Sequence, residues 1–136
     1  YWKPFYKSRF KNIISDLLHG KRLTQKEYFN ILADSKSVLH TSSPMGIIST
    51  RVFESLGSGA IGLFAFNSNA DCIFKEGIHF LSFGGIKDLI DNLYLIKTTN
   101  VNSKYQIIAN AGRKCIENNH TWKNRVAFFI DEVLKL

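Results

Sequence analysis

The chain has 136 residues, of which 45% are hydrophobic and 13% aromatic, so it is long enough and apolar enough to bury the core of one domain, and this composition argues against disorder. Its formal net charge of +7 favours phosphate-bearing partners, but the sequence has no arginine-rich or aromatic-interleaved motif of a nucleic-acid-binding protein. The apolar runs are too short for a transmembrane helix. Cys72 and Cys115 lack the spacing of a metal site, so we expect them to be free thiols in the reducing environment of the cytoplasm.

The first expected elements are helices. Arg9–Leu18 is expected to form a short helix that ends at Gly20. A second helix is expected to begin at Thr24, because Thr24 and Glu27 have the spacing of a capping box, in which each side chain accepts a hydrogen bond from the backbone of the other residue. The apolar side chains that follow at helical spacing are Tyr28, Ile31 and Leu32.

Three short apolar runs predict strands: Ser37–His40, Ala60–Phe64 and His79–Phe83. The middle run is continuously apolar, which is typical of a strand buried on both faces of a parallel sheet. A helix over Ser49–Leu56 is expected to connect the first two strands, and Asn67–Phe74 is expected to be a loop with a short helical turn. Strands separated by helices predict an α/β fold with a small parallel sheet flanked by helices.

Three amphipathic helices are expected after the last strand. The apolar face of the first is formed by Ile86, Leu89, Ile90 and Leu93. The second covers Ser103–Asn118, with Tyr105, Ile108, Ala111 and Cys115 facing inward. Thr121 is expected to cap the third helix, whose predicted buried stripe is Trp122, Val126, Phe129, Ile130 and Val133.

The segment after the first strand has the composition of an anion site. Gly46 allows a close backbone approach, and the N–H groups of Ser49, Thr50 and Arg51 lie in the first turn of a helix, where they lack intrahelical partners. The helix dipole and the Arg51 guanidinium favour a phosphate there, and Glu54 is placed one turn later to accept hydrogen bonds from a ribose diol. Ligands of open α/β sheets bind beyond the carboxyl ends of the strands, where this loop lies. The alternative is purely structural, because Ser/Thr caps and glycine turns are common in α/β domains.

Several segments resemble the group 1 glycosyltransferases. Residues 51–60, Arg-Val-Phe-Glu-Ser-Leu-Gly-Ser-Gly-Ala, are similar to the family's R-x-F-E-x-L-A-x-G-A signature. Together with Ser49 they fit the Ser-x-Arg-x-Phe-Glu pattern of the spore-maturation (CgeB-type) branch. Further similar segments occur in the family's order at Lys26–Lys36, Phe74–His79, Asn110–Arg113 and His120–Arg125, so the resemblance covers about residues 20–136.

The resemblance implies that residues 1–136 are one Rossmann-like, three-layer domain, the nucleotide-sugar-binding C-terminal half of a GT-B fold. The acceptor-binding N-terminal domain would then be absent from this chain, which begins at Tyr1 and not at Met. The chain alone is therefore not expected to be active. No metal or cofactor is implied besides the nucleoside-diphosphate sugar donor, and no catalytic residue is assigned.

The resemblance also implies roles for individual residues. Glu54 matches the glutamate that binds the ribose hydroxyls, and the backbone amides around Ser49–Arg51 would face the diphosphate. Leu23 falls where relatives place the base, although core packing is an equal alternative. Many relatives carry a glutamate at the position of Gly46, which leaves open the group that contacts the donor sugar. His40, at the end of the first strand, is the histidine expected nearest to the cleft.

Two other functions stay open from the sequence. The first is a non-catalytic relative that serves as a binding or scaffold module, which the glycine at position 46 motivates. The second is a nucleic-acid-binding domain, motivated by charge alone; nucleic acid is not the expected partner. Peripheral contact with a membrane surface is compatible with the basic charge.

Overall fold

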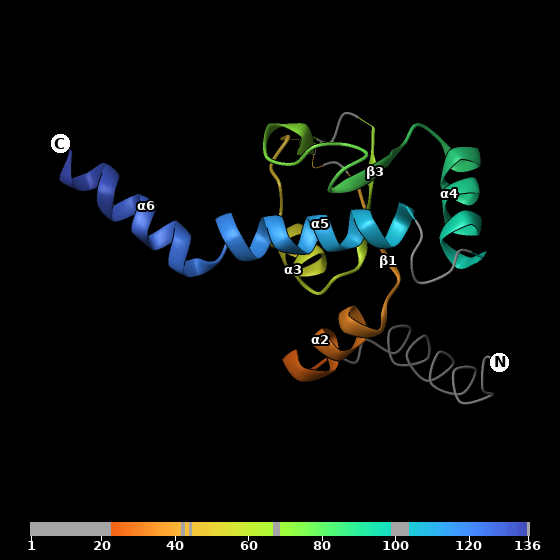
Figure 1. Ribbon diagram of the computed structural model, residues 1–136, viewed down its shortest axis with the longest axis horizontal. Helices are drawn as coiled ribbons and strands as arrows, with labels where there is room; N and C mark the ends of the chain where they lie inside the picture. Colours follow the sequence, from red (N-terminus) through yellow and green to blue (C-terminus); the bar gives the residue numbers. More distant parts are fainter. Residues whose placement is uncertain (1–22, 42, 44, 67–68, 99–103, 136) are drawn as a thin grey trace. The chain divides into compact units, whose positions relative to one another are not determined.

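The computed structural model describes residues 23–41, 43, 45–66, 69–98 and 104–135 (Figure 1). The chain divides into two compact units, residues 1–30 and 31–136. The helix expected at Arg9–Leu18 lies outside the described residues. Helix α2 covers Gln25–Asp34, and the predicted capping box at its start is confirmed: the Thr24 N–H donates to Glu27 Oε2 at 2.8 Å, and the Glu27 N–H donates to Thr24 Oγ1 at 3.3 Å.

A three-stranded parallel sheet forms the centre of the second unit. Its strands are β1 (Ser37–His40), β2 (Ile61–Ala65) and β3 (Phe80–Phe83), in the spatial order β1-β2-β3. Helix α3 (Thr50–Gly57) connects β1 to β2, and the short 3₁₀ helix η1 (Ala70–Cys72) lies between β2 and β3. The predicted α/β class and the small parallel sheet are confirmed. Because all three strands are parallel, the loops after β1 and β2 leave the sheet at the same edge.

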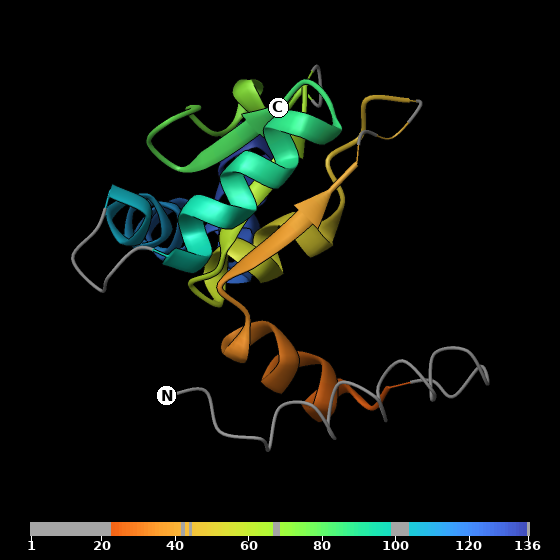
Figure 2. The same ribbon diagram turned by 90° about the vertical axis from the view of Figure 1, so that its right-hand side faces the viewer.

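Helices cover both faces of the sheet. On one face Val52 and Leu56 of α3 pack with Phe64 of β2. On the other face Ile96 of α4 (Ile86–Thr98) packs with Ile61 and Leu63 of the same strand, and Figure 2 shows α4 lying along the sheet. Side chains alternate between the two faces of a strand, so the two clusters lie on opposite sides of β2. The arrangement is the predicted three-layer, Rossmann-like one.

Helix α5 (Lys104–Asn119) packs beside α3 and against β2 and β3. Its buried residues are Ile108, Ala109, Gly112 and Ile116. A Cβ atom added to Gly112 would lie 2.7 Å from the carbonyl oxygen of His79, so the helix turns its smallest residue toward the sheet. The sequence prediction places Tyr105, Ala111 and Cys115 inward, and this is only partly correct. These three are only half-buried, although Tyr105 and Cys115 do pack against the core.

Helix α6 (Trp122–Leu134) continues from α5 and extends away from the sheet (Figure 1). Its predicted cap is confirmed: the Asn124 N–H donates to Thr121 Oγ1 at 3.3 Å, and the Thr121 N–H donates to Asn124 Oδ1 at 3.0 Å. The predicted buried stripe is wrong. No residue of α6 is buried by the described part of the chain, and Trp122 is 83% exposed.

The predicted apolar face of α4 is also mostly exposed. Ile86, Ile90 and Leu93 face solvent, and only Leu89 of the four packs against the core. The helix makes its main core contact near its end, through Ile96. The apolar pattern therefore predicts the helix correctly but not the surface that covers it.

Candidate functional site

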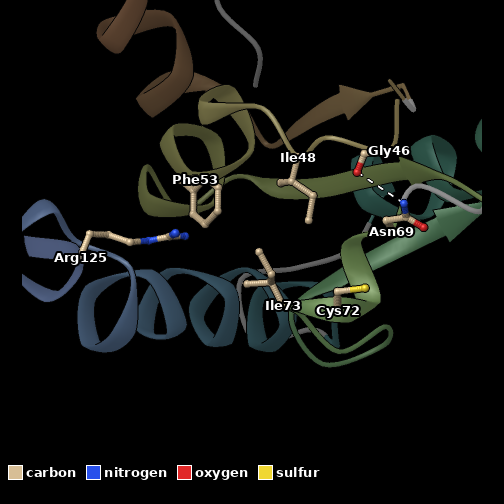
Figure 3. Close-up of a pocket in the computed structure, with 7 residues that line it drawn as sticks. All are labelled: Gly46, Ile48, Phe53, Asn69, Cys72, Ile73 and Arg125. Atoms are coloured by element: carbon tan, nitrogen blue, oxygen red, sulfur yellow. Dashed lines mark hydrogen bonds between the residues drawn. The ribbon is translucent and has the colours of Figure 1, made fainter. Parts of the chain in front are cut away.

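A pocket of about 340 Å³ opens beyond the carboxyl ends of the strands (Figure 3). Two of its lining segments follow the strands directly: the loop with Gly46 and Ile48 comes after β1, and the segment around η1 comes after β2. Helices α3 and α6 supply the remaining lining residues. The full lining is Gly46, Ile48, Phe53, Asn69, Cys72, Ile73 and Arg125. The pocket thus lies at the edge of the sheet where open α/β folds bind their ligands.

One end of the pocket is closed by two residues with left-handed backbones. Gly46 has φ +68° and Asn69 has φ +57°, a conformation that glycine and asparagine tolerate best. The Asn69 Nδ2 group donates a hydrogen bond of 3.4 Å to the Gly46 carbonyl (Figure 3). A Cβ atom at position 46 would lie 2.3 Å from that nitrogen. The close approach that the sequence predicts at Gly46 is therefore made by the side chain of Asn69.

The N-terminus of α3 lies between the Gly46 loop and the body of the helix. Ser49 occupies the cap position with φ −73° and ψ 156°, but its side chain makes no capping hydrogen bond. Ser49, Thr50 and Arg51 are exposed, and no described residue accepts a hydrogen bond from the N–H of Thr50 or Arg51. The first turn of α3 therefore presents backbone donors and one guanidinium to solvent. This arrangement suits an anion.

The other predicted site residues lie outside the pocket. Glu54 is half-buried on α3, directly after Phe53, so the two side chains leave the helix in directions about 100° apart. Leu23 belongs to the first unit and is half-buried. Among the six predicted residues, Gly46 alone lines the described pocket.

An aromatic cluster forms the opposite end of the pocket. The guanidinium carbon of Arg125 lies 5.0 Å from the centre of the Phe53 ring, which is a cation–π contact. His120 packs 5.6 Å from both Phe53 and Phe74. Burial lowers the pKa of His120, and the positive charges of Arg125 and His79 lower it further. His120 is therefore a neutral packing partner near neutral pH.

His40 is buried and not open to the cleft, contrary to the sequence expectation. Its Nε2 lies 2.7 Å from Ser55 Oγ, and the Ser55 hydroxyl donates to the Val52 carbonyl at 3.0 Å. Because that hydroxyl has a single proton, His40 Nε2 carries the hydrogen of the His40–Ser55 bond. Burial lowers the pKa of His40 to about 4, and its ring stacks on Phe64 with 4.9 Å between ring centres. A neutral His40 thus ties the end of β1 to α3.

Comparison with known protein families agrees with this geometry. The family described as glycosyl transferase-like matches residues 2–131, nearly the whole chain. The chain belongs to this family. A search of curated proteins and a search of solved structures each found no match.

Within this glycosyl transferase-like chain, the sequence prediction missed most of the pocket lining. Asn69, Cys72 and Ile73 come from a segment that the sequence predicts only as a loop with a short turn. The sequence does carry a signal at Asn69, because asparagine is one of the few residues other than glycine that is enriched at left-handed backbone positions. Arg125 lies in a segment similar to the terminal helices of the group 1 family, but a similar segment alone assigns it no contact.

Three further observations concern the cysteines, the metal-ligating side chains and the helices of this glycosyl transferase-like chain. Cys72 is exposed and Cys115 is half-buried, and both are free thiols as predicted. Across the described residues, no group of three or more His, Cys, Asp or Glu side chains is arranged to hold a metal ion. None of the helices in the described ranges combines the length and the hydropathy needed to span a bilayer.

Proposed function

We propose that this chain is the donor-binding domain of a two-domain, GT-B-type glycosyltransferase of the CgeB-type branch. It would bind a nucleoside-diphosphate sugar, and a separate N-terminal domain would bind the acceptor. One observation carries the proposal: the exposed N-terminus of α3 adjoins a pocket at the carboxyl edge of the sheet, in a chain of the glycosyl transferase-like family. The resemblance of residues 49–54 to the family signature supports the finer assignment.

The diphosphate would bind at the first turn of α3. The N–H groups of Thr50 and Arg51 point out of the helix end, and the helix dipole adds partial positive charge there. The Arg51 side chain is exposed and adds a full charge with a bidentate donor geometry. During transfer, negative charge grows on the leaving diphosphate, and preorganised donors of this kind stabilise it without side-chain acid–base chemistry.

The nucleoside would extend along the other side of α3. Glu54 would accept hydrogen bonds from the ribose hydroxyls in the donor complex, because it matches the ribose-binding glutamate of relatives and leaves the helix away from the pocket. Leu23 would contact the base. Both assignments are supported by the resemblance.

The diphosphate site is tested by Thr50→Pro. Proline is well tolerated at the first position of a helix, and Ser49 at ψ 156° has the extended backbone that precedes proline, so the variant removes one N–H and keeps α3. We expect Thr50→Pro to weaken binding of UDP, GDP, ADP, CDP or dTDP, whichever binds, by about tenfold, the value of one hydrogen bond to a charged group. Thr50→Ala, which keeps the N–H, is the matched control.

Melting temperatures with each nucleotide report this binding, because a ligand that binds the folded state raises the transition. If none of the nucleotides stabilises the protein, or if Thr50→Pro and Thr50→Ala behave alike, the diphosphate assignment is wrong. The ribose assignment has its own comparison. Glu54→Gln should weaken binding of the nucleoside diphosphate but not of inorganic pyrophosphate. Glu117 is an exposed carboxylate on α5, so Glu117→Gln should leave the affinity for both ligands unchanged.

A further inference from the structure

The position of the pocket relative to α3 indicates which part of a donor would occupy it. Thr50 and Arg51 do not line the pocket, whereas Phe53, three residues further along the helix, does. Residues three apart lie on the same helix face, about one turn deeper. A donor whose phosphates rest on the first turn of α3 therefore directs its next group into this pocket.

The walls of the pocket are apolar. Ile48 and Phe53 stand on one side and Ile73 faces them from the other, as Figure 3 shows. All three side chains are half-buried and pack against the core of the unit, so the walls are fixed before a ligand enters. A volume of about 340 Å³ is at the lower end of the range for small-molecule sites. The pocket suits one small ring and not an extended chain.

The described lining of the pocket carries one positive charge and no negative charge. Arg125 is the single charged side chain among the described residues that line the pocket, and no carboxylate lies in that lining. The ion pairs described elsewhere join Arg113 to Glu117 and Lys135 to Glu132, so neither involves Arg125. A guanidinium offers only donors, so it matches an anionic oxygen group better than a hydroxyl, which also needs an acceptor. The ring of Phe53 beneath it holds the cation in place before binding.

From these three observations we infer that this pocket receives the sugar of the donor, and that Arg125 selects a sugar carrying an anionic group such as a carboxylate. The inference rests on the proposed function, because the diphosphate site on α3 sets the direction of the sugar. Arg125 is then the specificity-determining residue. The Asn69 amide, at the opposite end of the pocket, contacts the ring hydroxyls.

The test compares two sugar phosphates that differ only at the distal carbon. Glucuronate 1-phosphate carries the carboxylate and glucose 1-phosphate does not, and neither contains a base, so the unidentified nucleotide does not affect the result. Binding is followed by NMR on the full chain, with the amide signals of Gly46, Asn69 and Cys72 as local reporters. We expect glucuronate 1-phosphate to bind about tenfold more tightly, as one charge-assisted hydrogen bond provides.

Variants then assign the preference to one side chain. Arg125→Gln should abolish the preference for glucuronate 1-phosphate, and Arg125→Lys should keep part of it, because the charge stays but the fork geometry is lost. Arg113→Gln is the matched control, since Arg113 is an exposed arginine on α5 outside the pocket, and it should keep the full preference. An unchanged amide spectrum away from the pocket shows that each variant is folded.

Three results would overturn the inference. The first is equal affinity of the protein for the two sugar phosphates, the second is an equal loss of affinity for both in Arg125→Gln, and the third is that neither sugar phosphate binds. The proposed function fails by a different measurement. If a nucleoside diphosphate binds and loses affinity in Thr50→Pro while the two sugar phosphates bind equally, the donor site stands and the sugar selectivity is wrong.

Discussion

Acidification should weaken this fold through one residue, His40. His40 is 9% exposed, and burial lowers its pKa from 6.5 to about 4. The unfolded chain therefore takes up the proton near pH 6.5, while the folded chain does not until about pH 4. The stabilisation from a neutral His40 is complete above pH 6.5 and is lost as the pH falls to 4. At about 1.4 kcal/mol for each pH unit in that window, the loss is about 3 kcal/mol.

The assay is urea unfolding of the protein and of His40→Gln at several pH values between 7.5 and 4. The carboxyl groups titrate alike in both proteins, so their effect cancels in the difference of the two free energies of unfolding. We expect that difference to shrink by about 3 kcal/mol toward low pH. A difference that does not change with pH, or a His40 ring signal that titrates near pH 6.5 in NMR, would refute the buried, neutral state tied to Ser55.

Three further substitutions test the packing around the pocket. Gly112→Ala should destabilise the protein by about 1–3 kcal/mol in urea unfolding, because the new Cβ meets the His79 carbonyl at 2.7 Å; a more stable variant would contradict the close packing of α5. Gly46→Ala should lower the free energy of unfolding by about 1–2 kcal/mol in thermal unfolding because of the positive φ at this position, in addition to the cost of the 2.3 Å contact with Asn69. Adding Asn69→Ala should recover only the stability lost through that contact. Thr121→Ala should cost about 1 kcal/mol and speed hydrogen exchange in the first turn of α6; unchanged exchange there would rule out the capping role.

The elements of this fold are encoded locally, which is why they could be predicted from the sequence. The capping box at Thr24 and the cap at Thr121 each depend on a partner three residues away, and both form as expected. The continuous apolar run that became β2 needs no knowledge of its neighbours either, since a strand buried on both faces is apolar at every position. The exposed first turn of α3 follows from the same kind of local pattern.

The coverage of apolar faces could not be predicted in this way. A repeat of apolar residues shows that a helix has an apolar side, but not which surface meets it. In α6 the repeat through Trp122 and Phe129 is real, yet the described chain leaves it exposed. In α5 the inward face is set by the close approach of Gly112 to His79, which depends on tertiary packing.

The pocket could not be predicted from the sequence for the same reason. It joins Gly46, Asn69 and Arg125 from three segments that are far apart in the chain. Their proximity depends on the order of parallel strands and on the direction in which α6 leaves α5. The sequence predicts the exposed first turn of α3 next to the pocket, but not that Arg125 lines the far end of the pocket.

Hydrogen bonds at the corner between α5 and α6 hold the start of the last helix in place. Asn124 Nδ2 donates to the Asn118 carbonyl at 3.0 Å, and with the Thr121 cap it anchors a helix of 13 residues that has no buried residue of its own. Such a helix is about 20 Å long, so a tilt of about 10° at the corner would move its far end by about 3 Å and Arg125 by about 1 Å. A tilt of this size would displace the exposed apolar side chains Val133 and Leu134 at the end of α6 more than it would displace the Arg125 guanidinium. The position of Arg125 over the Phe53 ring therefore depends on the start of α6 and little on what the end of that helix contacts.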